Sequence, residues 1–187
     1  MTDTLTLPRT GEVAGTWTID ASHSNAAFAV KYMMISTVRG RFDTVTGTVT
    51  LADPVEDSSI DVTLDVTSIN THDERRDGHL KSPDFFDVEN HPEMTFRSTK
   101  VERTSDDTGR VTGDLTIRGV SRPVVLDVRF EDWTAKDLWG KARIGFTAKT
   151  TISRKDWDLN WNQVLETGGV LVGDRVDIEL DVQLTRE

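Results

Sequence analysis

The chain of 187 residues contains no cysteine. This absence excludes disulfide bonds, thiolate nucleophiles and thiolate metal sites, and it leaves the redox compartment undetermined. The sequence also lacks an apolar run approaching the roughly 18 residues that a membrane-spanning helix needs. Residues 1–15 are polar and mixed in charge, without a basic stretch followed by an apolar one. We therefore expect no signal peptide and a cytoplasmic location.

Positive charge is in short supply. Lysine and arginine number 22 against 32 aspartates and glutamates, which gives a formal net charge of −10. No basic patch stands out in the sequence, so a nucleic-acid partner is not expected. The same charge predicts repulsion from anionic membranes, and we expect no stable membrane insertion.

Alternation of apolar and polar residues is the dominant pattern of the chain. It is clearest at residues 60–66, 124–130 and 176–184, and it is typical of strands with one buried face. Further strands are predicted at 25–33, 38–51, 94–103, 111–118 and 138–150, with a short one at 16–19. Short turn sequences separate them, which favours antiparallel pairing. We predict a flexible segment over residues 1–14 and one all-β domain over 15–187.

About eight antiparallel strands with one apolar face can close as a barrel or stack as a sandwich. Closure removes exposed sheet edges, and the length of the predicted strands favours a deep barrel. A barrel of eight strands either fills with side chains or encloses one small ligand. The spread of aromatic residues along the chain fits both an ordinary core and a lumen for an apolar ligand.

Two segments, 71–90 and 153–173, do not read as strands. The first predicts a polar helical turn followed by an apolar plug, because Phe85 and Phe86 stand side by side in a loop. His72 and His79 are seven residues apart and would share a helix face. Metal pairs favour a spacing of three or four, and arginines lie between these two histidines, so we expect no metal site.

Residue types of a catalytic triad occur near the amino terminus. Asp20, Ser22 and His23, with Ser24 beside them, offer an orienting group, a nucleophile and a base, but a triad is defined by geometry. The chain has neither a Gly-x-Ser-x-Gly elbow nor a phosphate-binding loop. We expect no catalytic residue. An enzyme would need a titratable group with a shifted pKa beside the lumen, for which His23 and Glu166 are candidates.

Several short motifs occur in a fixed order from about Gly15 to the end of the chain, and together they resemble the YceI-like family. The motifs are Trp17–Ser24 with Phe28-Ala29-Val30, Val38–Phe42, Arg76–Leu80, Asp84–Asp87, His91–Ser98, Gly113–Val120 with Pro123-Val124, Arg154–Trp157 and Glu166–Asp174. The resemblance implies an extended lipocalin-like antiparallel barrel that binds polyisoprenoid chains, such as isoprenoid quinones or prenyl lipids. The chain departs from many members in three ways: it lacks a signal peptide, and it has Tyr32 in place of a histidine and Asp158 in place of a glycine.

With the resemblance, the expected fold is an eight-stranded antiparallel extended lipocalin-like barrel, with a short helix and helical turns capping its ends. The expected function is binding, storage or transport of a long isoprenoid lipid, held non-covalently and with no other cofactor. The ligand-binding residues predicted on this basis are Phe28, Val30, Tyr32, Phe42, Leu64, Phe85, Phe86, Phe96, Leu115, Ile117, Ile144 and Phe146. Arg76, Asp77 and His79 are predicted to hold the gate formed by the two plug phenylalanines.

Two alternatives stay open on the sequence alone. One is a lipid-modifying enzyme that uses a titratable residue in the barrel, and the other is a stress-related structural protein with a filled barrel. A homodimer is compatible with the sequence.

Overall fold

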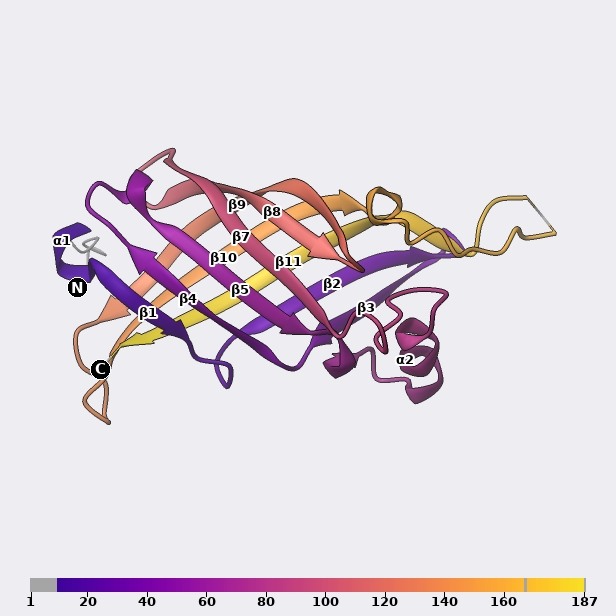
Figure 1. Ribbon diagram of the computed structural model, residues 1–187, viewed down its shortest axis with the longest axis horizontal. Coiled ribbons are helices and arrows are strands. Elements are labelled where there is room, and N and C mark those ends of the chain that lie inside the picture. The colour runs from indigo at the N-terminus through magenta and orange to yellow at the C-terminus, as the bar shows by residue number, and fades with distance from the viewer. Residues whose placement is uncertain (1–9, 167, 187) are drawn as a thin grey trace.

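The computed structural model describes residues 10–166 and 168–186, and Figure 1 shows that strands dominate it. The strands are β1 (Gly15–Ile19), β2 (Asn25–Tyr32), β3 (Ser36–Phe42), β4 (Val45–Leu51), β5 (Ser59–Asp65), β6 (Ile69–Asn70), β7 (Glu93–Arg103), β8 (Thr108–Ile117), β9 (Val120–Thr134), β10 (Ala142–Ser153) and β11 (Val172–Arg186). The helices are α1 (Thr10–Val13) and α2 (Glu74–Lys81), and three 3-10 turns are η1 (Val55–Asp57), η2 (Val66–Ser68) and η3 (Arg154–Trp157). No helix within the described ranges has both the length and the apolar character to cross a membrane.

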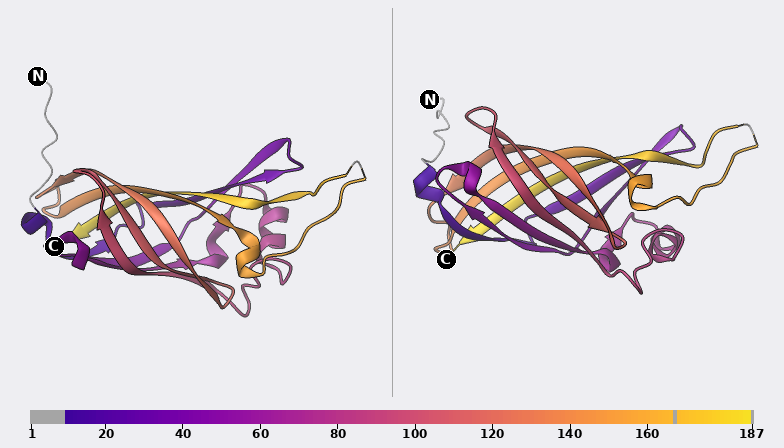
Figure 2. Two further views of the ribbon diagram at one scale, coloured as in Figure 1. Left: turned by 90° about the horizontal axis from the view of Figure 1, so that it is seen from above. Right: turned by 45° about the horizontal axis from the view of Figure 1, so that its top comes forward.

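Eight strands close into an antiparallel barrel, as predicted. They follow the order β1-β4-β5-β7-β8-β9-β10-β11, and β1 pairs back to β11 through Thr18 with Thr185 and Ile19 with Leu184. The 15 residues of β11 extend beyond β1 and also pair with β2, from which β3 and β6 continue the sheet. The barrel therefore has two different ends. The terminal end carries both chain termini, and the α2 end carries α2 and residues 153–172 (Figures 1 and 2).

The strand predicted over residues 38–51 is wrong, because the structure divides it into β3 and β4. The chain turns a corner at Asp43, whose backbone N–H donates to the Ser68 carbonyl at 3.2 Å. After this corner β4 pairs with β1 and β5, whereas β3 pairs with β2 and β6. The buried positions change parity here, from the even-numbered Phe42 to the odd-numbered Val45 and Val49, because the chain bends between the two strands. This change of parity was the signal for the corner. The strand predicted from residue 138 likewise begins only at Ala142, after a turn that contains Asp137.

One apolar core lies at the terminal end. Trp17 and Leu184 are completely buried there, and the Trp17 Nε1–H donates to the Val13 carbonyl at 2.8 Å. Val13 is itself buried, so α1 packs onto the barrel. Of the segment predicted to be flexible, residues 1–9 lie outside the described residues, and residues 10–14 belong to this packed region.

A second core lies toward the α2 end. The side chain of Trp157 is buried, and its Nε1–H donates to the Leu115 carbonyl at 2.9 Å. Val66 and Ile69 are also buried in this cluster. The hydrogen bond ties η3 to β8, so the segment after β10 starts from a fixed point on the barrel wall.

Candidate functional site

A cavity of about 730 Å³ lies inside the barrel. Its size falls in the range of about 300–1,000 Å³ that is usual for ligand pockets. All twelve residues predicted to bind ligand line it: Phe28, Val30, Tyr32, Phe42, Leu64, Phe85, Phe86, Phe96, Leu115, Ile117, Ile144 and Phe146. They come from six different strands and from the loop after α2, so the fold of the whole sheet is what brings them together.

Many further apolar residues line the cavity although the sequence reading did not single them out. They include Val45, Val49, Ile60, Val62, Met94, Val111, Val124, Leu126, Val128, Ala148, Ile178 and Leu180. The signal was present as alternation in the predicted strands. Alternation identifies a buried face, but it does not distinguish a residue beside an open lumen from one in a filled core.

Two glycines of the wall make room for aromatic rings. A Cβ placed on Gly40 would lie 2.5 Å from Cζ of Phe28, and one on Gly113 would lie 2.4 Å from Cζ of Phe96. Gly40 is the cross-strand partner of Phe28. Each ring therefore occupies space against the wall that a side chain would otherwise take.

Helix α2 is fixed to the barrel through Thr71, which is almost fully buried. Arg76 donates from Nε to the Thr71 Oγ1 at 2.7 Å and from Nη2 to the Thr71 carbonyl at 2.8 Å. The Asp77 carboxylate accepts from the Thr71 N–H at 2.9 Å and from its hydroxyl. Arg76 lines the cavity, whereas Asp77 is not among its lining residues.

The prediction that His72 shares a helix face with His79 is wrong. Asp73 caps α2 by accepting from the Arg76 N–H at 3.0 Å, so the helix begins at Glu74. His72 precedes this cap in the left-handed region, with φ of 59°. An aspartate before a charged run is itself an N-cap signal, and it could have placed the start of the helix correctly.

An aromatic cluster lines the cavity beside α2. The His79 ring meets Trp161 edge-on at 4.6 Å and Phe85 at 5.1 Å between ring centroids, and Phe85 lies 5.2 Å from Trp161. His79 Nε2 also contacts Asp84 Oδ2 at 2.9 Å. Trp161 lines the cavity but was not predicted as a site residue. The signal for it was an aromatic residue in a segment that does not read as a strand.

Arg154 holds the segment that carries Trp161. Its side chain is buried, and its guanidinium donates to the carbonyls of Leu159, Trp161, Val172 and Gly173. Burial lowers the pKa of Arg154, while the nearby carboxylate of Asp174 acts in the opposite direction. The Arg154 side chain therefore joins the segment after η3 to the start of β11 by hydrogen bonds.

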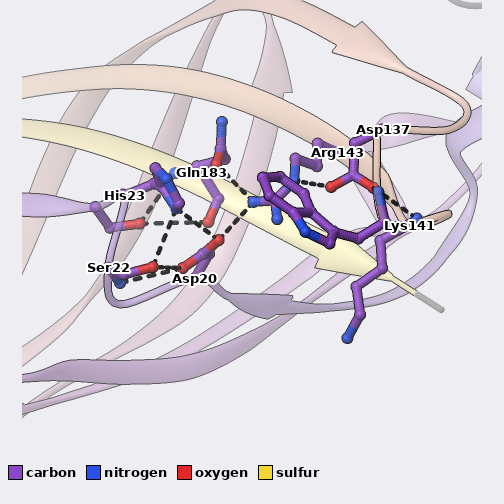
Figure 3. A network of polar contacts seen from close by, with 9 residues as sticks. Asp20, Ser22, His23, Asp137, Lys141, Arg143 and Gln183 are labelled. Atoms are coloured by element: carbon purple, nitrogen blue, oxygen red, sulfur yellow. Dashed lines mark hydrogen bonds and ion pairs between the residues drawn. The ribbon is translucent and has the colours of Figure 1, made fainter.

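Asp20, Ser22 and His23 do come together, in the turn between β1 and β2 (Figure 3). The Ser22 hydroxyl donates to Asp20 Oδ1 at 2.6 Å, and His23 Nδ1 lies 2.9 Å from Asp20 Oδ2 and 3.0 Å from the Ser22 Oγ. The serine proton thus points to the carboxylate instead of to a base. None of the three residues lines the barrel cavity, and neither does the exposed Glu166.

This turn belongs to a polar network centred on Arg143. The Arg143 guanidinium contacts the carboxylates of Asp20 and Asp137 and donates to Gln183 Oε1 at 2.8 Å. The hydrogen bond from Ser22 is the largest cause that holds the pKa of Asp20 well below its usual range. The network joins the β1–β2 turn, the β9–β10 turn and β11, which is a structural task (Figure 3).

The Arg143 network predicts a pH-dependent contribution to stability. Hydrogen bonds from the Arg143 side chain and from the Lys141 backbone lower the pKa of Asp137 from 3.8 to about 2. A depressed folded-state pKa stabilises the protein above pH 3.8, and this stabilisation is lost as the pH falls toward 2. We expect Arg143→Met to lower Tm at neutral pH and to flatten the fall of Tm over that acidic interval.

Calorimetry across this pH range would measure the effect. Arg129→Met is the matched control, because Arg129 pairs with Asp107 at 2.9 Å on the exposed surface. A surface pair of this kind contributes little to stability. Equal loss of Tm in both variants would contradict a special role for the Arg143 network.

Within residues 10–166 and 168–186, no three histidine, aspartate or glutamate side chains group closely enough to hold a metal ion. The lining is mainly apolar. Its ionisable groups are Lys31, Asp73, Arg75, Arg76, His79 and Arg154 toward the α2 end, Glu102, Arg103, Asp106, Asp107 and Arg110 at the β7–β8 hairpin, and Asp181. Such a lining suits a molecule with a long hydrocarbon part and a polar terminus.

Comparison with known proteins agrees with this geometry. The model of the YceI-like domain matches residues 17–184. The UPF0312 protein SA2479 of Staphylococcus aureus strain N315 is 35% identical over 172 residues, which cover 90% of this chain and 96% of that protein. The solved YCEI protein of Campylobacter jejuni is 31% identical, with a TM-score of 0.71 over 84% of this chain and 90% of that one.

Two more distant structures share the fold. BcnA of Burkholderia cenocepacia has a TM-score of 0.77 at 23% identity and covers 88% of this chain and 98% of its own. A polyisoprenoid binding domain from Saccharophagus degradans has a TM-score of 0.71 at 16% identity and covers 91% and 98%. The family model spans almost the whole barrel and the relatives match it along their full length, so the chain belongs to the YceI-like family.

Proposed function

We propose that this protein binds a long isoprenoid lipid, such as a prenyl quinone, in the barrel lumen and carries it without chemical change. The cavity of about 730 Å³ and its apolar lining are the observation on which the proposal depends. Each CH₂ group moved from water into such a lining gains about 0.8 kcal/mol. A prenyl tail can therefore bind tightly with few hydrogen bonds, even though its ordering costs entropy.

In this proposal the twelve predicted residues that line the cavity contact the hydrocarbon chain. Phe85 and Phe86 cover the α2 end, and Arg76, Asp77 and His79 hold this cover through their contacts with Thr71 and Asp84. The name of the Saccharophagus degradans domain, which shares the fold, supports an isoprenoid as the ligand class.

Two alternatives fit the structure less well. A filled barrel would leave no continuous space, and the cavity opposes it. A lipid-modifying enzyme was expected to use His23 or Glu166 beside the lumen, and neither residue lies there. Among the polar groups of the lining near α2, Arg76 contacts Thr71, Lys31 contacts Thr37 and His79 contacts Asp84.

Native mass spectrometry of the gently purified protein, followed by organic extraction, tests the proposal. We expect a bound lipid, or uptake of an added quinone that carries a long prenyl tail. The same quinone head group without a tail is the control and should not bind measurably. Equal binding of both compounds, or of neither, would overturn the proposal.

A further inference from the structure

Six of the nine exposed large apolar side chains in the described part of the chain lie at the α2 end, and two of the others, Leu138 and Trp139, lie at the terminal end. The turn between β2 and β3 exposes Met34 by 68% and Ile35 by 83%, and Tyr32 and Met33 by 38% each. The loop before β11 exposes Val164 by 84%. We call residues 32–35 together with Val164 and Val170 the apolar tip.

The two parts of the apolar tip lie side by side. The Met33 N–H donates to the Leu171 carbonyl at 2.7 Å, and Tyr32 pairs with Val172. Figures 1 and 2 show that the β2–β3 turn and the loop before β11 both project beyond the barrel at the α2 end. Together they form a projecting apolar surface at one end of the molecule.

The turn keeps apolar residues where turn chemistry favours others. Met33 and Met34 have φ of 52° and 58°, and the Ile35 N–H donates to the Tyr32 carbonyl at 3.1 Å. This is a type I′ turn, for which Asn-Gly is strongly preferred. Two methionines there cost conformational energy, and a local rule broken in this way is typical of functional sites.

The hairpin below the turn is locally basic in an acidic protein. Residues 25–42 contain Lys31, Arg39 and Arg41 and no aspartate or glutamate, whereas the whole chain has a net charge of −10. All three cationic residues are exposed. Glu166 is the one charged residue in the other half of the apolar tip, between residues 161 and 172. This hairpin therefore carries positive charge within a chain that is acidic as a whole.

The apolar tip is continuous with the cavity. Tyr32 belongs to the tip and also lines the cavity. Leu171 and Val172, at the base of the neighbouring loop, line the cavity as well. An apolar molecule at the tip would thus meet an apolar surface that leads inward. A stable protein interface buries about 800 Å² on each partner. A hairpin turn and the end of a loop present a narrow surface, which suits insertion into a lipid layer better than contact with a second protein.

We propose that the apolar tip inserts into the surface layer of a lipid bilayer that carries anionic head groups. Met34 and Ile35 enter the boundary of the acyl chains, and Lys31 and Arg39 lie at the level of the head groups. Asp43 pairs with Arg41, and Asp177 on the neighbouring β11 pairs with Arg175, so Lys31 and Arg39 are the cations that meet the head groups. Salt screens the more distant carboxylates over about 8 Å. The inference rests on the proposed function in one respect, because docking matters for lipid transfer if the cavity holds a lipid.

Flotation of the full chain with phosphatidylcholine vesicles containing phosphatidylglycerol tests the docking. Replacing Met34 and Ile35 together with serine should lower the fraction bound at least about tenfold, since each side chain loses its burial in the bilayer. Leu138→Ser with Trp139→Ser is the matched control, because these side chains are exposed by 94% and 75% at the terminal end. The control should bind vesicles as the unchanged protein does.

A second variant separates docking from folding. Met33→Asn with Met34→Gly supplies the preferred type I′ turn, so it should raise Tm by about 2–4 °C while lowering vesicle binding. Arg39→Glu should weaken binding to vesicles with phosphatidylglycerol and have little effect on pure phosphatidylcholine vesicles. Unchanged vesicle binding in the Met33 and Met34 variant would overturn the proposal.

Failure of docking can be distinguished from failure of the proposed function. Uptake of a prenyl quinone from detergent solution needs the cavity but no bilayer. Uptake without flotation would overturn the docking and leave the lipid carrier standing, whereas flotation without uptake would do the reverse. A concentration-dependent dimer that disappears on replacing Met34 and Ile35 would identify the tip as a contact between copies and overturn the proposal.

Discussion

Replacing Ala148 with tryptophan is expected to weaken lipid binding by about 100-fold while leaving the barrel folded. Ala148 is buried in β10, lines the cavity and pairs with Val128 and Leu180 on the neighbouring strands. An indole at this position enters the lumen and occupies space needed by the ligand. Displacing three to four methylene groups at about 0.8 kcal/mol each raises Kd by about 100-fold.

The neighbouring residue provides the control for this experiment. Lys149 is exposed, so Lys149→Trp places the same side chain on the outside of the same strand. Overpacking a filled core costs about 1–3 kcal/mol, and the open lumen should keep the cost for Ala148→Trp below that range. Titration with a prenyl quinone and thermal melting measure both quantities. Full affinity in the Ala148 variant would mean that the ligand does not lie in the lumen.

Replacing Arg154 with alanine is expected to cause the largest loss of stability. The guanidinium satisfies the carbonyls of Trp161 at 2.9 Å and Gly173 at 2.9 Å, along with two others in the same segment. Without it these carbonyls lose their partner in a region that is largely closed to water. Leaving buried carbonyl groups without their charged hydrogen-bond partner lowers the free energy of unfolding by about 3–5 kcal/mol. Release of Trp161 from the cluster with His79 and Phe85 should also speed ligand loss.

Lys155 is the matched control for this variant. It is adjacent in sequence, and its Nζ contacts the same Asp174 carboxylate at 2.9 Å, but its side chain is 52% exposed. An exposed pair contributes at most about 1 kcal/mol. Urea unfolding should separate the two variants by several-fold in free energy. Similar losses of unfolding free energy for Arg154→Ala and Lys155→Ala would show that the hydrogen bonds of Arg154 contribute little to stability.

Some elements of the fold could be predicted from the sequence and others could not, and the difference has physical reasons. Alternation located most of the strands correctly because burial of one face imposes a period of two. It was read as continuous over residues 38–51, although the buried positions change parity between Phe42 and Val45, where the chain turns its corner at Asp43 and changes its pairing partners. The break predicted between residues 33 and 38 falls at the turn of Met33 and Met34, but the type of the turn was not predicted, because it lacks the glycine or asparagine by which type I′ turns are recognised.

The site shows the same division. The aromatic and aliphatic lining followed from strand faces and from the family resemblance, and every residue predicted to bind ligand lies at the cavity. Trp161 and Arg154 were not predicted, since their contacts with His79 and with backbone carbonyls join segments far apart in the chain. Such contacts leave no periodic trace in the sequence, and only the folded geometry reveals them.

The width of the cavity depends on two residues that do not line it. Gly40 and Gly113 are not among the cavity-lining residues, yet each allows a phenylalanine ring to recline against the wall. A methyl group on either glycine would push its ring inward and narrow the channel. Exchange of a wall glycine for a larger residue would therefore change which ligands fit the cavity, by their thickness, while every lining side chain stays the same.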